Sequence, residues 1–246
     1  MRKVLSLTLL LSLATLAGAQ GKWHFNFGVG GELKSGNVNS ITLNNSGGIE
    51  RNDSLIALDA NYAIVYGKQD QKVYDQSFTA NLKFDFWQYD RWSPFVSATY
   101  LNNKFKGFEF QNKFLAGVKY RIYWNERCDY SVSAAYVFDM TEYMNQDDDR
   151  LKPQVSRLSL RLKIKQKISD YVSIKHTTFY QPSLMDLGGF QSVKDDYIVT
   201  SITSLSTKLS KHLTFDLSFN YEYRSLVPEG VQNQDIITTG TLKLNF

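Results

Sequence analysis

From Trp23 to the last residue, apolar and polar side chains alternate with a period of two, in blocks of roughly 10 to 14 residues. Successive side chains of a β-strand point to opposite faces, so each block predicts a strand with one apolar and one polar face. The clearest block lies within 156–168, where Leu158, Leu160, Leu162, Ile164 and Ile168 alternate with Arg157, Arg161, Lys163, Lys165 and Lys167. Repeated blocks of this kind, separated by turns, are typical of a membrane β-barrel.

A second block, within 108–122, carries the same kind of pattern. It places Phe108, Phe110 and Phe114 on the predicted apolar face, and Lys119 and Arg121 on the predicted polar face. Seven clear blocks and five weaker ones together predict about twelve strands, which is an even number, as is usual for bacterial barrels.

The connections between blocks alternate in length. Short turns are expected at 51–53, 89–91, 125–127, 169–170 and 210–212, and longer links at 67–72, 103–107, 143–153, 183–194 and 225–234. Membrane barrels have short periplasmic turns and longer external loops. We therefore expect an all-β fold, an antiparallel transmembrane β-barrel over residues 20–246 with both termini on the periplasmic side. A secreted β-sandwich is the alternative, but it would not sort its loops by length.

The N-terminal segment predicts export. Met1, Arg2 and Lys3 precede an apolar run over 4–16, and Ala17-Gly18-Ala19 follows it. This arrangement is typical of a secretory signal peptide, here residues 1–19, with cleavage before Gln20. A retained anchor is the alternative, but the run is shorter than the ~20 apolar residues of a membrane-spanning helix. No later apolar run is long enough to predict such a helix.

Charge and cysteine content exclude several classes of function. Without Arg2 and Lys3 the chain has 26 basic and 24 acidic residues, and this near balance argues against nucleic acid as a partner. Cys128 is the only cysteine, so no intrachain disulfide can form; we expect it to act as a small apolar residue on a strand. We predict no cofactor.

The C-terminal block ends on an aromatic residue. Phe246, Leu244 and Leu242 share one face, and this ending resembles the signal that the barrel-assembly machinery reads in bacterial outer-membrane proteins. The resemblance implies location in the bacterial outer membrane, in contact with lipid and lipopolysaccharide. The four tryptophans support it, because Trp23, Trp87, Trp92 and Trp124 all lie near predicted periplasmic ends, where a membrane interface would favour them.

Three short segments resemble one known family. ELKSGNVNS at 32–40, YGKQD at 66–70 and YQPSL at 180–184 are similar to segments of the salt-induced outer-membrane proteins, a family of unknown function. The resemblance extends over essentially the whole chain after residue 20, although its motifs are short and mostly structural. It implies an outer-membrane barrel without an assigned reaction, and it offers no catalytic residues.

The basic row is the strongest candidate for a functional site. If the leucines of this strand face lipid, then Arg157, Arg161, Lys163, Lys165 and Lys167 line the lumen, and Lys119 and Arg121 add to them, because charge facing hydrocarbon is costly. A cationic lumen favours small anionic solutes. We therefore expect a narrow passive channel with anion preference. In the alternative, these bases pair with interior carboxylates and plug the barrel, which then serves envelope stability or stress; both interpretations remain open.

A lipid-modifying enzyme is a third possibility. Of the histidines, His176 is expected on the outer face with Thr178 and Tyr180, where a lipid-directed base would lie, but no serine accompanies it. We therefore assign no catalytic residue.

Asp147, Asp148 and Asp149 form an acidic run that lacks calcium-loop spacing, so we expect a solvated loop and no metal site.

Overall fold

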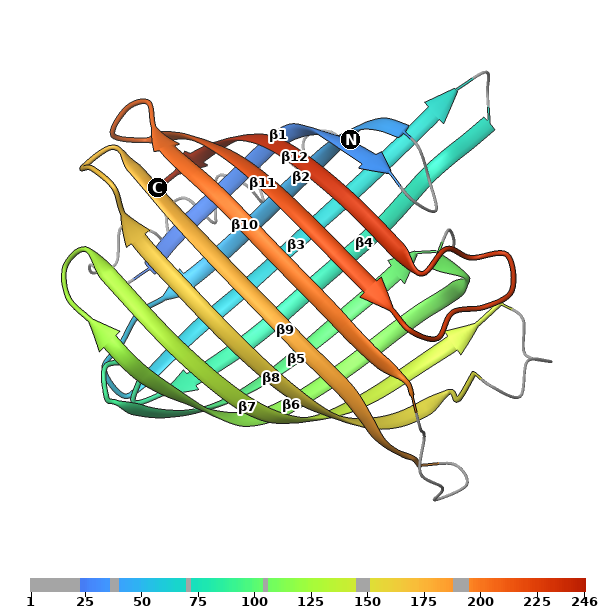
Figure 1. Ribbon diagram of the computed structural model, residues 1–246. Coiled ribbons are helices and arrows are strands. Elements are labelled where there is room, and N and C mark those ends of the chain that lie inside the picture. Colours follow the sequence, from blue (N-terminus) through green and yellow to red (C-terminus); the bar gives the residue numbers. More distant parts are fainter. Residues whose placement is uncertain (1–22, 36–39, 70–71, 104–105, 145–150, 188–194) are drawn as a thin grey trace, which may run out of the picture.

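The computed structural model describes residues 23–35, 40–69, 72–103, 106–144, 151–187 and 195–246. Twelve strands form one closed sheet in which each strand pairs antiparallel with the next and β1 pairs with β12 (Figure 1). They are β1 Trp23–Ser35, β2 Ser40–Arg51, β3 Ile56–Gln69, β4 Lys72–Phe86, β5 Trp92–Asn103, β6 Phe108–Trp124, β7 Cys128–Tyr143, β8 Gln154–Lys167, β9 Val172–Asp186, β10 Tyr197–Lys208, β11 Leu213–Arg224 and β12 Gln234–Asn245. The predicted all-β, twelve-stranded antiparallel barrel is confirmed. Over the described residues, no helix has the length and apolar character needed to cross a membrane.

The two ends of the barrel differ in their connections. Short turns join the strands at the end we call the short-turn end, on the left in Figure 1, and most of the longer links lie at the other, the long-loop end. One expected long link is largely strand, because β3 continues to Gln69 and β4 begins at Lys72. This hairpin extends beyond its neighbours in Figure 1. The barrel begins and closes at the short-turn end, where Phe25 and Phe246 exchange backbone hydrogen bonds of 3.1 and 2.9 Å.

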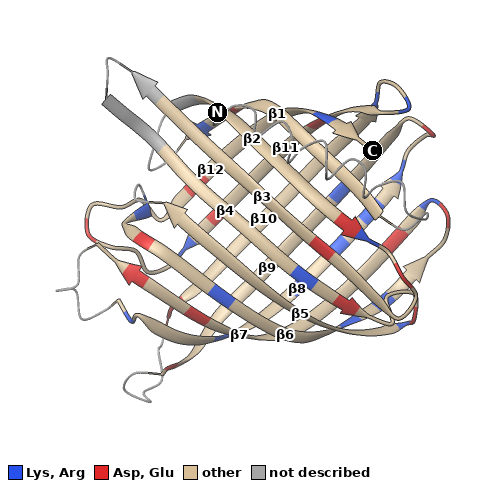
Figure 2. Ribbon diagram, turned by 180° about the vertical axis from the view of Figure 1, so that it is seen from behind, with Lys and Arg blue, Asp and Glu red and all other residues tan. Residues whose placement is uncertain are grey.

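The outer wall of the barrel is apolar. Leu160 and Leu162 are 42% and 40% exposed, and large apolar side chains of the other strands are exposed in the same way. Their alternating neighbours face the interior, where polar and charged residues predominate. Charged residues therefore occur along the strands as well as in the connections (Figure 2). Leu160 and Leu162 do not lie between stacked sheets, so the sandwich alternative is wrong.

Aromatic residues surround the short-turn end, as the sequence predicts. Trp87, Trp92 and Trp124 are exposed there. The Arg91 guanidinium lies over the rings of both Tyr120 and Trp124, at 6.0 and 5.6 Å from their centroids. A ring of aromatic and basic side chains at the edge of an apolar wall is the arrangement that membrane interfaces favour.

One residue predicted to face outward faces inward. Phe108 is only 1% exposed and contacts interior side chains. The pairing of β6 with both neighbouring strands shifts register next to this residue, between Leu101 and Asn103 on β5 and between Phe108 and Phe110 on β6. An extra residue at a β-bulge reverses the alternation beyond it, so the period-two pattern assigns the wrong face to Phe108.

The seam between β1 and β12 depends on glycine. A Cβ atom added at Gly30 would overlap the carbonyl oxygen of Gly240 and lie 2.8 Å from Cα of Thr241. At neighbouring Gly31 an added Cβ would meet only the carbonyl oxygen of Thr42, at 3.9 Å. Backbone atoms cannot yield as a flexible side chain can, so Gly30 allows the close approach of the two strands.

Gly30→Ala should therefore destabilise the folded barrel by about 3 kcal/mol, through overpacking at the seam. The free energy of unfolding is measured by urea titration of the protein folded in detergent micelles. Gly31→Ala is the matched control and should remain close to wild type. Equal stability of the two variants would contradict the close packing described for this seam.

Candidate functional site in the barrel lumen

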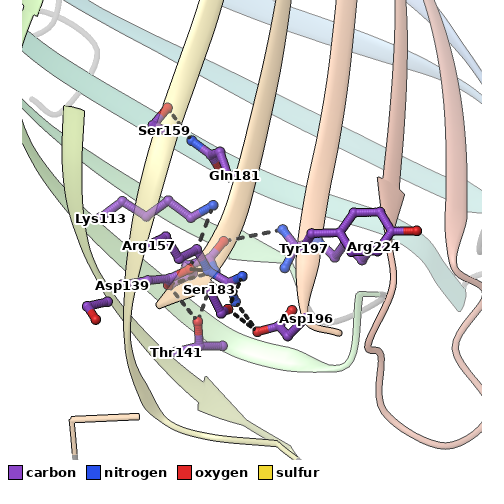
Figure 3. Close-up of polar contacts among 12 residues, drawn as sticks. Lys113, Asp139, Thr141, Arg157, Ser159, Gln181, Ser183, Asp196, Tyr197 and Arg224 are labelled. Carbon is purple, nitrogen blue, oxygen red and sulfur yellow. Dashed lines mark hydrogen bonds and ion pairs between the residues drawn. The ribbon is translucent and has the colours of Figure 1, made fainter. Parts of the chain in front are cut away.

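The predicted basic row faces the interior, but its members have different surroundings. Arg157 lies toward the long-loop end of β8, whereas Arg161, Lys163, Lys165 and Lys167 continue along the same face toward the short-turn end. Figure 3 shows the polar contacts around Arg157. The predicted site therefore divides into two parts, one near each end of the lumen.

Arg157 is part of a buried ion-pair network. It is 5% exposed, and its guanidinium donates hydrogen bonds to Asp139 at 3.1 Å, to Asp196 at 2.9 Å and to the Ser183 hydroxyl at 2.7 Å (Figure 3). Lys113 lies 3.8 Å from Asp139 as well. Two carboxylates thus balance the charge of Arg157. Its surroundings match the plug interpretation better than a role in anion selectivity.

This network continues across the lumen. The Gln111 side-chain amide donates to Asp139 at 2.9 Å, and the guanidinium of Arg224 donates to the Gln111 carbonyl oxygen at 3.3 Å. Gln111 is on β6 and Arg224 on β11, and these strands are separated by four strands in one direction around the barrel and by six in the other. Their side chains therefore meet from nearly opposite walls.

A residue from the β5–β6 connection completes this contact. Lys106 forms ion pairs with Glu222 at 2.7 Å and with Asp235 at 3.4 Å, on β11 and β12. Arg224 pairs with Glu222 at 2.9 Å and lies over the ring of Phe108 at 5.4 Å. We call Lys106, Gln111, Glu222, Arg224 and Asp235 the cross-lumen latch. Its charges balance, and it ties opposite walls together near the long-loop end.

The connections at this end pack against each other. Gly107 has a φ of +78°, a conformation that favours glycine, and an added Cβ would lie 2.7 Å from the Pro228 ring. Pro228 belongs to the β11–β12 connection, so this loop contacts the β5–β6 connection directly above the latch. This contact could not be predicted from the alternation of side chains, because that pattern does not determine where loops fold.

Away from the rim of the barrel, four cations in the half of the lumen nearer the short-turn end have no acidic partner among the described residues. Within the described parts of the chain, Arg161, Lys163, Lys165 and Lys175 form no ion pair and donate no hydrogen bond to a carboxylate. We call these four residues the basic cluster. Lys165 and Lys175 are direct cross-strand partners on β8 and β9, and both are exposed to the interior space of the barrel. An unbalanced positive charge thus lines this part of the lumen.

The other predicted cations are paired or lie at the edge of the barrel. Lys119 lies 3.5 Å from Asp85, which also pairs with Lys83. Arg121 lies 3.5 Å from Asp129 at the short-turn end. Lys167 is exposed at the end of β8. The lumen therefore combines the two alternatives that the sequence left open, with paired charges near one end and unpaired cations in the other half.

His176 is on the outer face of β9, as expected. Its Nδ1 lies 2.9 Å from the Thr203 hydroxyl and its Nε2 lies 2.9 Å from the Thr178 hydroxyl. Neither contact supplies the carboxylate that orients a catalytic histidine. The described residues contain no group of three or more potential metal ligands of the His, Cys, Asp or Glu type. Asp147, Asp148 and Asp149 lie outside the described residues.

A known protein family matches this chain along most of its length. The family described as "Protein of unknown function, DUF481" matches residues 27–246. The chain belongs to this family. The match runs from Phe27 within β1 to the C-terminus, so it extends over nearly the whole barrel. Its description does not include the salt-induced name of the family that the sequence resembles. No curated protein sequence matches the chain.

Solved structures with the same fold include outer-membrane porins. The NanC porin superposes with a TM-score of 0.59 at 9% identity, over 89% of this chain and 98% of its own. The KdgM porin gives 0.52 at 11% identity, over 90% and 99%. A bacterial polysaccharide outer membrane secretin gives 0.51 at 8% identity, over 92% and 98%. At these identities the similarity establishes the fold alone.

The buried network around Arg157 makes a prediction about stability. Arg157→Met should destabilise the barrel by about 3 kcal/mol, because it leaves Asp139 and Asp196 buried without their main cation. Urea unfolding measures the change, with Arg127→Met in an exposed short turn as the control. A variant as stable as the control would show that solvent already screens the two carboxylates.

Proposed function

We propose that this DUF481 protein is a narrow passive channel of the bacterial outer membrane with a preference for small anionic solutes. Three features support the proposal: a closed barrel, an apolar outer wall with an aromatic edge, and an interior lined by polar and charged residues. In hydrocarbon every backbone polar group must be satisfied internally, and a closed barrel does this. The outer-membrane porins with the same fold agree with this proposal.

The basic cluster is the observation that carries the anion preference. Cations without an acidic partner raise the local concentration of anions, most strongly where walls of low dielectric constant surround a narrow aqueous space. Arg161, Lys163, Lys165 and Lys175 meet this condition, whereas Lys119, Arg121 and Arg157 are paired. We therefore assign selectivity to the four residues of the cluster.

One solved structure with this fold supports an anionic solute class. It is the KdgM porin in complex with disordered oligogalacturonate, with a TM-score of 0.50 at 11% identity. Oligogalacturonate carries carboxylates, so a barrel of this architecture can accommodate an anionic saccharide. We extend to this protein only the sign of the charge, because the identity is too low to transfer a particular solute.

The cross-lumen latch favours a second candidate, a plugged barrel with a role in envelope stability. Side chains from β6, β11, β12 and the β5–β6 connection meet within the lumen, and the two cations Lys106 and Arg224 balance Glu222 and Asp235. In this alternative the latch blocks passage and the barrel is structural. A lipid-modifying enzyme using His176 is less favoured, because the residues that contact it are threonines.

The outer wall and the C-terminal residues of the barrel would contact partners in the outer membrane. The outer wall would contact lipid and lipopolysaccharide, and the ending Leu242, Leu244 and Phe246 would be read by the barrel-assembly machinery during insertion. The alternation of these three residues is consistent with this role, because Leu242 and Leu244 are exposed on the outer face and Phe246 is exposed beside them.

Conductance in a planar bilayer tests the anion preference. Under a KCl gradient, the wild-type protein should give a reversal potential of the sign expected for chloride permeation. The double variant Arg161→Glu with Lys163→Glu should shift the potential toward that of potassium, because two unpaired cations become anions. Lys211→Glu, in the exposed β10–β11 turn, is the control for a charge reversal outside the lumen. Current without anion preference in the wild type would contradict the proposal.

The same bilayer recordings distinguish an open channel from a plugged barrel. Lys106→Ala removes the two ion pairs that connect the β5–β6 connection with β11 and β12, so it should raise single-channel conductance if the latch narrows the lumen. Lys211→Ala again serves as the control. An electrically silent wild type with a conducting Lys106→Ala variant would favour the plugged barrel.

A further inference from the structure

The four cations of the basic cluster lie close together on one wall of the lumen, an arrangement that an unselective pore does not require. Lys165 and Lys175 are directly opposite each other on neighbouring strands, where Cβ atoms lie about 5 Å apart and like charges repel. Lys163 and Arg161 follow on the same face of β8, each two residues further along. Four cations are thus concentrated on one wall, and their mutual repulsion opposes folding unless anions offset it.

The carboxylates that face the cluster from other strands offset only part of this charge. Asp129, the cross-strand partner of Lys165 on β7, forms its ion pair with Arg121 at 3.5 Å. Asp85 is engaged by Lys83 and Lys119. Asp59 accepts a hydrogen bond from the Asn61 amide at 2.9 Å. The charge of Asp59 acts on Lys175, and those of Asp85 and Asp129 act on Arg161. Three carboxylates, two of them shared with other cations, do not balance the four cations of the cluster.

Arg161 is held in place although it has no anionic partner. Its guanidinium lies over the ring of Phe95 at 5.6 Å, and Lys83 approaches the same ring at 5.1 Å. Its Nε is buried and has no hydrogen-bond acceptor among the described residues. Phe95 is on β5, three strands away from β8, so it extends into the lumen to make this contact. The ring contact therefore fixes the guanidinium, and its two terminal nitrogens, which are not buried, can donate to an oxygen-bearing anion.

We propose that the basic cluster binds a small solute that carries two or more anionic groups, carboxylates or phosphates. Arg161 offers its planar fork to one group, and Lys163, Lys165 and Lys175 bind the others. The inference deepens the proposed function, since it requires that solutes enter the lumen, but it concerns equilibrium binding and not ion flow. A single monovalent anion cannot offset four cations, which is why the site favours several charges on one molecule.

Isothermal titration of the barrel folded in detergent tests this site. Citrate and pyrophosphate are the probes for the two chemical classes, and acetate at equal ionic strength is the monovalent control. At least one polyanion should bind saturably and about tenfold more tightly than acetate, the gain expected from one further charge-assisted contact. The thermal unfolding midpoint of the same samples provides a second readout, because a ligand of the folded state raises it.

Matched variants assign the binding to the cluster. Arg161→Gln and Lys163→Gln should each weaken polyanion binding about tenfold, whereas Lys211→Gln should leave it unchanged. Folding of each variant is checked first by its circular dichroism spectrum, and Lys175→Gln replaces any variant that does not fold. Saturable binding that these substitutions do not weaken, or binding of neither polyanion, would overturn the assignment. Anion-selective current together with no polyanion binding would overturn this inference alone and leave the proposed function intact.

Discussion

The closure of β1 against β12 is the contact on which the rest of the structure depends. A sheet in hydrocarbon cannot leave an unpaired edge, because each unsatisfied backbone group costs several kcal/mol. Closure also creates an inside, and the period-two alternation then assigns every side chain to the wall or to the lumen. Gly30 shows how strict this seam is, since even one methyl group would meet backbone atoms of β12.

Alternation predicted the fold because it is a local property of the chain. Strand count, antiparallel closure and the outward position of Leu160 and Leu162 all follow from a period that can be read along the sequence. The rule fails where a register shift interrupts the period, as at Phe108. It also misjudged the β3–β4 link, where the strands continue beyond the residues expected to form a loop.

The partners of the lumen charges could not be predicted in the same way. Lys106 and Glu222 are 116 residues apart in sequence, and Gln111 and Arg224 are 113 apart. Such contacts depend on the diameter of the barrel and on the path of its loops, which no local pattern encodes. The sequence identified a basic row on β8, but only the structure separates the buried, paired Arg157 from the unpaired Arg161 and Lys163.

The latch and the basic cluster occupy different parts of one tube, and this makes the barrel electrically asymmetric along its axis. The end with the latch has balanced charges, whereas the half with the basic cluster has an excess of positive charge. In a barrel that conducts as proposed, this asymmetry would make the current at one polarity of the applied voltage larger than at the other. The direction in which the barrel is inserted would then decide which side of the membrane faces its positively charged half.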